Sequence, residues 1–105
     1  MITAEITILI KIIIIDYATG VMAAILEKEV RSSIGMKGIF KKFGVILCVI
    51  LCTYLDSSSI LQNTAKITPV IITFFIFNEG ISITENLKRL GLNLPEELIK
   101  FFPKK

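Results

Sequence analysis

The chain contains no histidine, and this absence removes several chemistries at once. Histidine is the usual general base near neutral pH, the base of Ser-His-Asp triads and the commonest metal ligand in proteins. The sequence also lacks a glycine-rich phosphate-binding loop and a basic stretch interleaved with aromatic residues. We therefore expect no enzyme activity, no cofactor and no nucleic-acid partner.

Cysteine is almost as scarce, since Cys48 and Cys52 are the two in the chain and both lie inside an apolar run. A disulfide framework needs several cysteines in a small secreted domain. A structural zinc site takes four Cys or His ligands, which this sequence cannot supply. We interpret both cysteines as ordinary buried apolar side chains and expect no metal site.

Apolar residues are in excess, because 53% of the 105 residues are hydrophobic and the mean hydropathy is +0.76. A soluble domain is about 45 to 50% apolar. A soluble domain of this size buries only roughly 65% of its unfolded surface, so much of this apolar surface would stay in water. A lipid bilayer is the solvent that suits such a chain.

Three apolar stretches follow one another, separated by two polar loops. A helix needs about 20 residues to cross a bilayer, and barrel strands would alternate polar and apolar residues, which these stretches do not. The first stretch lacks the basic start of a signal peptide, so we expect it to be retained. We predict an all-α integral membrane protein of about three transmembrane helices in a single domain of residues 1–105. The expected spans are about 6–26, 43–62 and 67–86, with a cytoplasmic tail at 87–105.

The tail contains a pattern typical of a short amphipathic helix, "NLPEELIKFF". Pro95 with Glu96 and Glu97 suits a first helical turn. The apolar residues that follow would lie on the membrane surface. A plain chain end is the alternative.

Positive charge is concentrated in the segment between the first two stretches. The loop between the second and third stretches offers only Lys66. By the positive-inside rule we expect the first loop and the C-terminus to be cytoplasmic and the N-terminus to be outside. We also expect the basic residues on the cytoplasmic side to contact anionic lipid headgroups. The residues expected in this basic cytoplasmic loop include Arg31, Lys37, Lys41 and Lys42.

Polar residues occur inside the expected spans, where a carboxylate costs about 2.5 to 3.5 kcal/mol to insert. In the first span, Asp16 shares one helical face with Gly20 and Ala24, and this small-xxx-small spacing allows close helix approach, although such spacing also arises by chance.

In the third span, Asn78, Ser82 and Glu85 share a face with Glu79 at its flank, and the opposite side with Ile72 should meet lipid. The alternative is that the third span ends near Phe77 and its polar end lies at the interface. The candidate pore-facing or helix-packing residues are Asp16, Gly20, Ala24, Asn78, Glu79, Ser82 and Glu85.

Four segments, in this order and spacing, resemble the phage lysis and toxin-secretion holins, a family that includes the clostridial toxin-release holins. They are "DYATGVMAAI" at 16–25, "SSIGMKGIFKK" at 32–42, the Leu55-Asp56 pair and "NEGISITENLKRLGLNLPEEL" at 78–98. The resemblance implies a protein of the bacterial cytoplasmic membrane that forms homo-oligomers and opens a pore. An endolysin or a secreted toxin then crosses, and cytolysis can follow.

The resemblance is weakest at the two ends of the chain. Similar proteins usually carry a longer N-terminal hydrophobic region and a longer charged tail, so we expect a shortened form. Two other interpretations stay open at this point. One is an antiholin-like or truncated, non-lytic prophage remnant, and the other is a small accessory subunit of a membrane complex.

Overall fold

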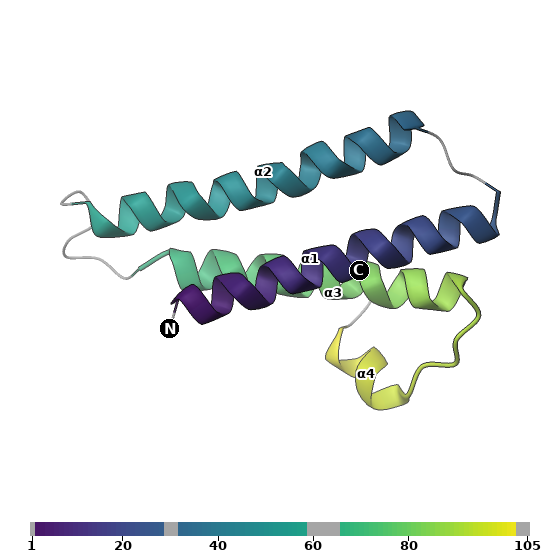
Figure 1. Cartoon of the computed structure of the whole chain (residues 1–105). Helices are drawn as coiled ribbons and strands as arrows, with labels where there is room; N and C mark the ends of the chain where they lie inside the picture. Colours follow the sequence, from purple (N-terminus) through teal and green to yellow (C-terminus); the bar gives the residue numbers. More distant parts are fainter. Residues whose placement is uncertain (1, 29–31, 59–65, 103–105) are drawn as a thin grey trace.

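The computed structural model describes residues 2–28, 32–58 and 66–102, and these residues form four α-helices and no strand. The helices are α1 (Ile2–Leu26), α2 (Ser32–Ser57), α3 (Thr68–Arg89) and α4 (Glu96–Phe101), shown in Figure 1. The first three contain segments long and apolar enough to cross a membrane, at Ala4–Leu26, Gly35–Ser57 and Thr68–Arg89. The predicted fold class, three membrane helices and a short C-terminal helix, is confirmed.

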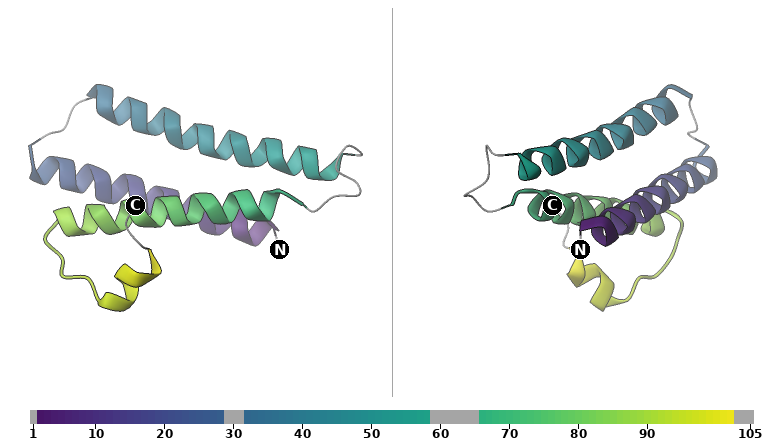
Figure 2. Two further views of the ribbon diagram at one scale, coloured as in Figure 1. Left: turned by 180° about the vertical axis from the view of Figure 1, so that it is seen from behind. Right: turned by 60° about the vertical axis from the view of Figure 1, so that its left-hand side comes forward.

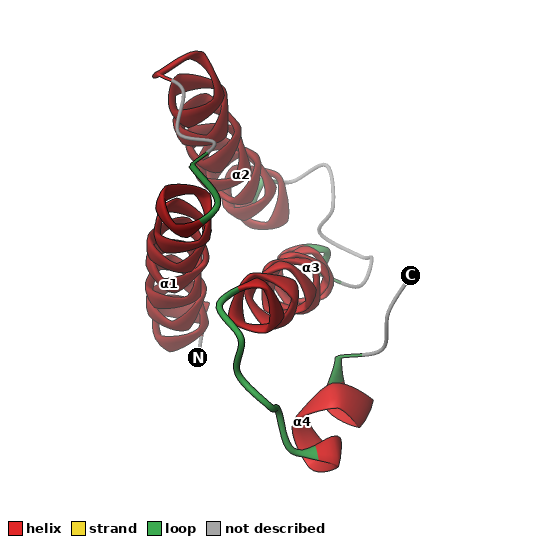
Figure 3. Ribbon diagram, turned by 90° about the vertical axis from the view of Figure 1, so that its right-hand side faces the viewer, coloured by secondary structure: helices red, strands yellow, loops and turns green. Residues whose placement is uncertain are grey.

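The long helices form an open bundle in which α1 and α3 run parallel and α2 runs antiparallel to both (Figures 1 and 2). Seen along the bundle, the three long helices lie at the corners of a triangle (Figure 3). Helix α1 packs most extensively against α3 and least against α2. The α1–α3 pair is therefore the tightest part of the bundle.

One half of the bundle has an apolar core, made by the first half of α1, the second half of α2 and the start of α3. Its buried members are Leu9, Ile13, Val45, Val49 and Ile72. Ile72, which we expected on the lipid side of α3, is only 1% exposed, because this side of the helix packs on α1 and α2. Large apolar side chains also cover the outside, among them Ile14, Phe43, Leu47 and Val70 at 62 to 68% exposure, as suits a lipid solvent.

Helix α2 begins earlier than the expected second span. The segment "GMKGIFKK", predicted as part of a loop, is helical, and Gly35 and Gly38 lie under the ring of Tyr17 from α1. A Cβ at Gly35 would be 3.7 Å from the Tyr17 hydroxyl, and one at Gly38 would be 3.9 Å from the ring. Tertiary packing thus overrides the weak helix propensity of glycine here. The expected end of that span, residue 62, lies outside the described residues.

The start of α3 is capped by a residue of the preceding helix. Asp56, near the end of α2, accepts hydrogen bonds from the backbone N–H of Ile67 at 2.9 Å and of Thr68 at 2.8 Å. Pro69 in the first turn has no N–H to satisfy. Asp56 therefore supplies the cap that α3 lacks locally and fixes the turn between the two helices.

The other end of α3 is a Schellman motif at Gly91. Its backbone has φ +92°, and hydrogen bonds run from Gly91 N–H to Lys88 O and from Leu92 N–H to Leu87 O. Lys88 and Arg89 occupy the last turn, where positive charge suits the helix dipole.

Candidate functional site: a charged cluster within the helix bundle

Three charged side chains, one from the middle of each long helix, meet inside the bundle. We call Asp16 of α1, Lys42 of α2 and Glu79 of α3 the charged triad. The Lys42 ammonium donates to Asp16 Oδ2 and to Glu79 Oε1, the latter at 2.6 Å. Asp16 is 5% exposed and Glu79 is 4% exposed. One lysine thus pairs with two buried carboxylates and connects all three helices.

The triad explains why charges are tolerated at this depth. An unpaired carboxylate in a bilayer is costly, and intramembrane charges normally face the bundle interior and pair with one another. Breaking a buried pair by removing one partner typically costs about 3 to 5 kcal/mol, because the remaining charge is left uncompensated. The three helices are therefore held in register by groups that cannot easily be separated from each other in lipid.

Asn86 extends the triad along the α1–α3 contact. Its amide Nδ2 donates to the backbone O of Asp16 at 3.2 Å, to Asp16 Oδ1 at 3.1 Å and to Thr19 Oγ1 at 3.1 Å. The absence of a side chain at Gly20 permits this approach, since a Cβ there would be 3.4 Å from the same nitrogen. The small and polar face predicted for α1 is thus used within one copy of the chain.

An ion pair closes the same helix pair at its end. Arg89 of α3 donates to Glu27 Oε1 through Nη2 at 2.6 Å and through Nε at 3.2 Å. Glu27 lies just beyond α1, and the hydrogen bond from Arg89 lowers the pKa of its carboxyl below the usual value. Both side chains are more than a third exposed, so this pair orients the helix ends and adds little stability.

Of the remaining predicted residues, Ser82 lies within hydrogen-bonding reach of the Asp16 carboxylate, whereas Ala24, Asn78 and Glu85 lie around the contact. Asn78 and Ser82 are half-buried, Ala24 is half-buried beside the fully buried Ala23, and Glu85 is exposed. The polar face of α3 is thus rotated from the predicted one: Glu79 and Asn86 point inward, whereas Glu85 points out. Sequence reasoning placed Glu79 at the flank and left Asn86 out of the candidate site. The sequence did contain a signal for Asn86: it follows Glu79 by seven positions, and this interval places both residues on one helical face.

The basic residues of the expected loop are divided by the structure. Lys37 and Lys41 are exposed on the first turns of α2, while Lys42, one position further around the helix, enters the triad. Arg31 lies outside the described residues. Lys42 therefore contributes to internal pairing and not to the cytoplasmic surface charge.

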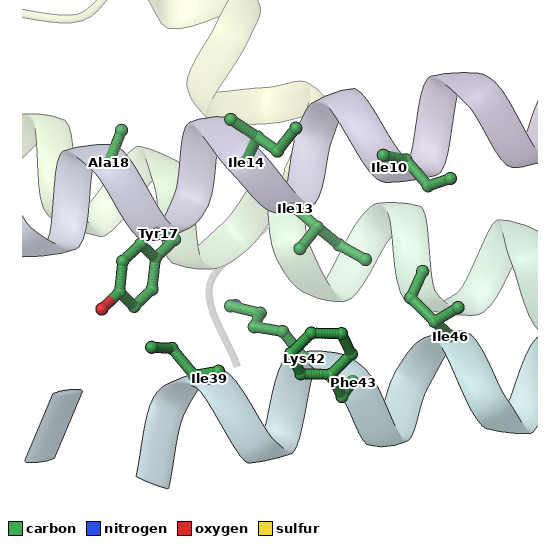
Figure 4. A pocket seen from close by; sticks show the side chains of 9 residues that line it. All are labelled: Ile10, Ile13, Ile14, Tyr17, Ala18, Ile39, Lys42, Phe43 and Ile46. Atoms are coloured by element: carbon green, nitrogen blue, oxygen red, sulfur yellow. The ribbon is translucent and has the colours of Figure 1, made fainter. Parts of the chain in front are cut away.

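An apolar groove of about 400 Å³ lies beside the triad, between α1 and α2 (Figure 4). The stem of Lys42 lines it, while its ammonium bonds the two carboxylates. Within the described residues no group of three His, Cys, Asp or Glu side chains is arranged to hold a metal ion. The arrangement offers helix pairing and loose α1–α2 packing. The lining residues are Ile10, Ile13, Ile14, Tyr17, Ala18, Ile39, Lys42, Phe43 and Ile46.

Comparison with known proteins gives a family model described as the bacteriophage holin family, which matches residues 2–104. An uncharacterised 14.9 kDa protein in the nagH 3' region of Clostridium perfringens is 43% identical over 86% of this chain and 67% of its own length. A probable holin of Bacillus phage phi105 is 39% identical over 78% of this chain and 59% of its own length. An uncharacterised protein of Halalkalibacterium halodurans is 33% identical over 91% of this chain and 73% of its own length. The chain thus spans about two thirds of the length of such relatives, and no solved structure matches it.

Proposed function

The chain belongs to the bacteriophage holin family, and from this membership and the charged triad we propose that it oligomerises in the bacterial cytoplasmic membrane and permeabilises it. An endolysin or a toxin without its own export signal then crosses through the lesion. Residues 1–105 act as one multi-pass membrane unit in this proposal. The observation that carries it is the charged triad, which keeps two carboxylates and an ammonium in the middle of three membrane helices.

A single copy is suited to accumulate without leaking. Its buried charged groups are paired inside the bundle, and large apolar side chains face outward on α1, α2 and α3. Three helices also have too little wall to enclose an aqueous path. A single copy therefore leaves the membrane impermeable, and any opening must involve several copies.

Reorganisation of the bundle is the proposed source of the aqueous lining. Helix α2 packs weakly on α1, and the apolar groove lies between them. When copies assemble, separation of α2 from the α1–α3 pair would expose Asp16 and Glu79 to a shared lumen, where water replaces Lys42 as their partner. Ser82, whose side chain lies against Asp16, would border this lumen, whereas Glu85 points away from it.

The experiment that tests the proposal expresses the chain in bacteria and follows membrane potential with a dye, with and without a cytoplasmic endolysin. We expect sudden depolarisation in both cultures and lysis only where the endolysin is present. A matched chain with Asp16→Leu, Lys42→Leu and Glu79→Leu removes the triad together and serves as the non-opening control. A stable potential, with the wild-type chain present in the membrane fraction, would contradict the proposal and favour an antiholin-like or accessory role.

A further inference from the structure

Lys11 is a charged residue of α1 that takes no part in the charged triad. It lies seven positions inside Ala4, the start of the first membrane-crossing segment, which is about 10 Å along the helix. Its side chain is exposed, and among the described residues it has no ion-pair partner. A charged side chain at this depth normally pairs with another group or extends toward the membrane interface. The outer surface of α1 therefore presents a cation that no described side chain neutralises.

The apolar groove between α1 and α2 begins beside this lysine. Ile14 and Ala18, which line the groove, follow Lys11 by three and seven positions, and these intervals place the three residues on one face of α1. Ile10, the residue before Lys11, lines the groove as well. A helical side chain leans toward the N-terminus of its helix, so Lys11 is directed toward the start of α1 and away from the bundle centre. A positive charge and an apolar groove thus adjoin along α1.

The groove encloses about 400 Å³ between apolar walls (Figure 4). Ile14 and Phe43 on these walls are 62% and 63% exposed in the chain alone. Apolar voids stay dry, because water finds no hydrogen-bond partners in them, and an unfilled void loses packing contacts. Both walls belong to segments that can cross a membrane, where the surrounding medium consists of lipid acyl chains. An acyl chain is therefore the material available to fill the groove.

The groove lies at the depth that the end of an acyl chain reaches. Its α1 wall runs from Ile10 to Ala18, six and fourteen positions inside Ala4, which corresponds to about 9 and about 21 Å. The middle of a hydrocarbon core of about 30 Å lies at about 15 Å. A phospholipid in the leaflet at the N-terminus of α1 can thus have its phosphate near Lys11 while the second half of one acyl chain occupies the groove.

We propose that Lys11 and the apolar groove together bind one phospholipid, with its phosphate at the Lys11 ammonium and one acyl chain between α1 and α2. An ammonium and a phosphate form a charge-assisted hydrogen bond, which gives the exposed lysine a partner. The acyl chain supplies packing between α1 and α2, the two long helices that pack least against each other. The bound lipid thereby stabilises the closed bundle. The site requires membrane insertion but no permeabilisation.

Native mass spectrometry of the full chain, purified in detergent after reconstitution into phosphatidylglycerol vesicles, tests the site. We expect one phosphatidylglycerol molecule to remain bound to the chain. Lys11→Leu should lower the bound fraction several-fold, and Lys11→Arg should retain it, since arginine also binds phosphate. Lys41→Leu is the matched control, because Lys41 is exposed on α2 and does not line the groove. Diacylglycerol with the same acyl chains lacks the phosphate, so its binding should not differ between the wild type and Lys11→Leu.

Filling the groove tests the acyl-chain part of the site. Ala18→Phe adds a large ring to the groove wall and should reduce bound phosphatidylglycerol and diacylglycerol to background, with unchanged helical circular dichroism. Ala4→Phe is the same change at an exposed position outside the groove, and it should leave the bound lipid unchanged. In Tyr54→Phe, Tyr17 is the remaining tyrosine of a chain without tryptophan. A phospholipid brominated near the end of its acyl chains should quench Tyr17 fluorescence, and adding Ala18→Phe should reduce this quenching.

Three outcomes would overturn the inference. The first is a wild-type chain that retains no phospholipid. The second is an equal loss of bound lipid in Lys11→Leu and Lys41→Leu, since general charge attraction would then explain the binding. The third is undiminished lipid in Ala18→Phe, since the acyl chain would then lie elsewhere. A chain that binds the lipid as predicted but never depolarises a membrane would reject the proposed function and leave the lipid site intact.

Discussion

At the scale of single residues, Lys42 is the side chain on which the charged cluster depends. It pairs with two buried carboxylates from two other helices. Its neighbour Lys41 has the same chemistry but points into the surroundings. The two lysines therefore form a matched pair for separating a buried charge from a surface charge.

Lys42→Met should lower the free energy of unfolding in detergent by about 3 to 5 kcal/mol, because Asp16 and Glu79 are left without a counter-charge. Lys41→Met should change it by about 0.5 kcal/mol or less, as is usual for surface positions. Denaturant unfolding followed by helical circular dichroism gives both values. Similar losses for the two variants would show that the triad does not hold the bundle together.

Glu79→Gln tests the triad without changing side-chain volume. The neutral amide weakens the pairing with Lys42, so depolarisation should begin earlier after induction while the amount of inserted protein stays the same. Glu85→Gln is the control, because Glu85 is exposed and has no part in the triad. If Glu79→Gln kept wild-type timing, we would have to abandon the triad as the element that keeps the bundle closed.

At the scale of helices, the capping of α3 by Asp56 connects two spans through their shared turn. Asp56→Ala removes the acceptor for both the Ile67 and the Thr68 N–H. We expect a loss of about 0.5 to 2 kcal/mol, the usual range for an N-cap. Ser57→Ala, which removes only a bond back to Thr53 on an exposed side, should cost less. Thermal unfolding in detergent compares the two, and equal losses would mean that the cap contributes nothing specific.

The ion pair between Glu27 and Arg89 should make the α1–α3 ends sensitive to acid. The Glu27 pKa is lowered by the hydrogen bond from Arg89, so its stabilisation is present above the unfolded pKa and is lost as pH falls through the folded one. The melting temperature of the wild type should therefore exceed that of Glu27→Gln at neutral pH, and the two should converge in acid. A constant difference across this range would exclude the carboxylate as the cause.

The sequence predicted the helices better than it predicted their rotation. Apolar runs of sufficient length identified three spans, and the expected third span, 67–86, lies within about three residues of α3. The start of α2 was missed because glycines and lysines at 35–42 are typical of a loop, and their packing partner, Tyr17, is remote in sequence. Residues at a helix boundary are decided by such tertiary contacts.

The charged cluster itself was only partly predictable. Asp16, Gly20 and Glu79 were identified because polar or small residues inside an apolar run call for an explanation. Lys42 was assigned to the cytoplasmic loop, since nothing local distinguishes it from Lys41. The pairing depends on the rotation of three helices relative to each other, and a single helical wheel does not contain that information.

At the scale of the whole molecule, the two halves of the bundle differ in character. An apolar core occupies the half that contains the N-terminus of α1. Helix α2 begins and α3 ends at the other end of the bundle (Figure 1). Exposed basic residues belong to these two helix ends, Lys37 and Lys41 in α2 and Lys88 and Arg89 in the last turn of α3. By the positive-inside rule we expect this basic end to face the cytoplasm. The polar contacts of α1 and α3 begin near the middle of the two helices and continue toward this basic end.

The central claim is that polar groups closed within one copy become exposed to water when the membrane opens. Ser82 is half-buried beside the triad on α3. The probe of this exposure is Ser82→Cys in a chain whose two native cysteines are removed by Cys48→Ala and Cys52→Ala. Its reaction with a membrane-impermeant thiol reagent should be absent before depolarisation and rapid after it, while Leu47→Cys, on the exposed side of α2 and outside the groove, stays unreactive. A Ser82→Cys thiol that remains unreactive in fully depolarised cells would contradict the account.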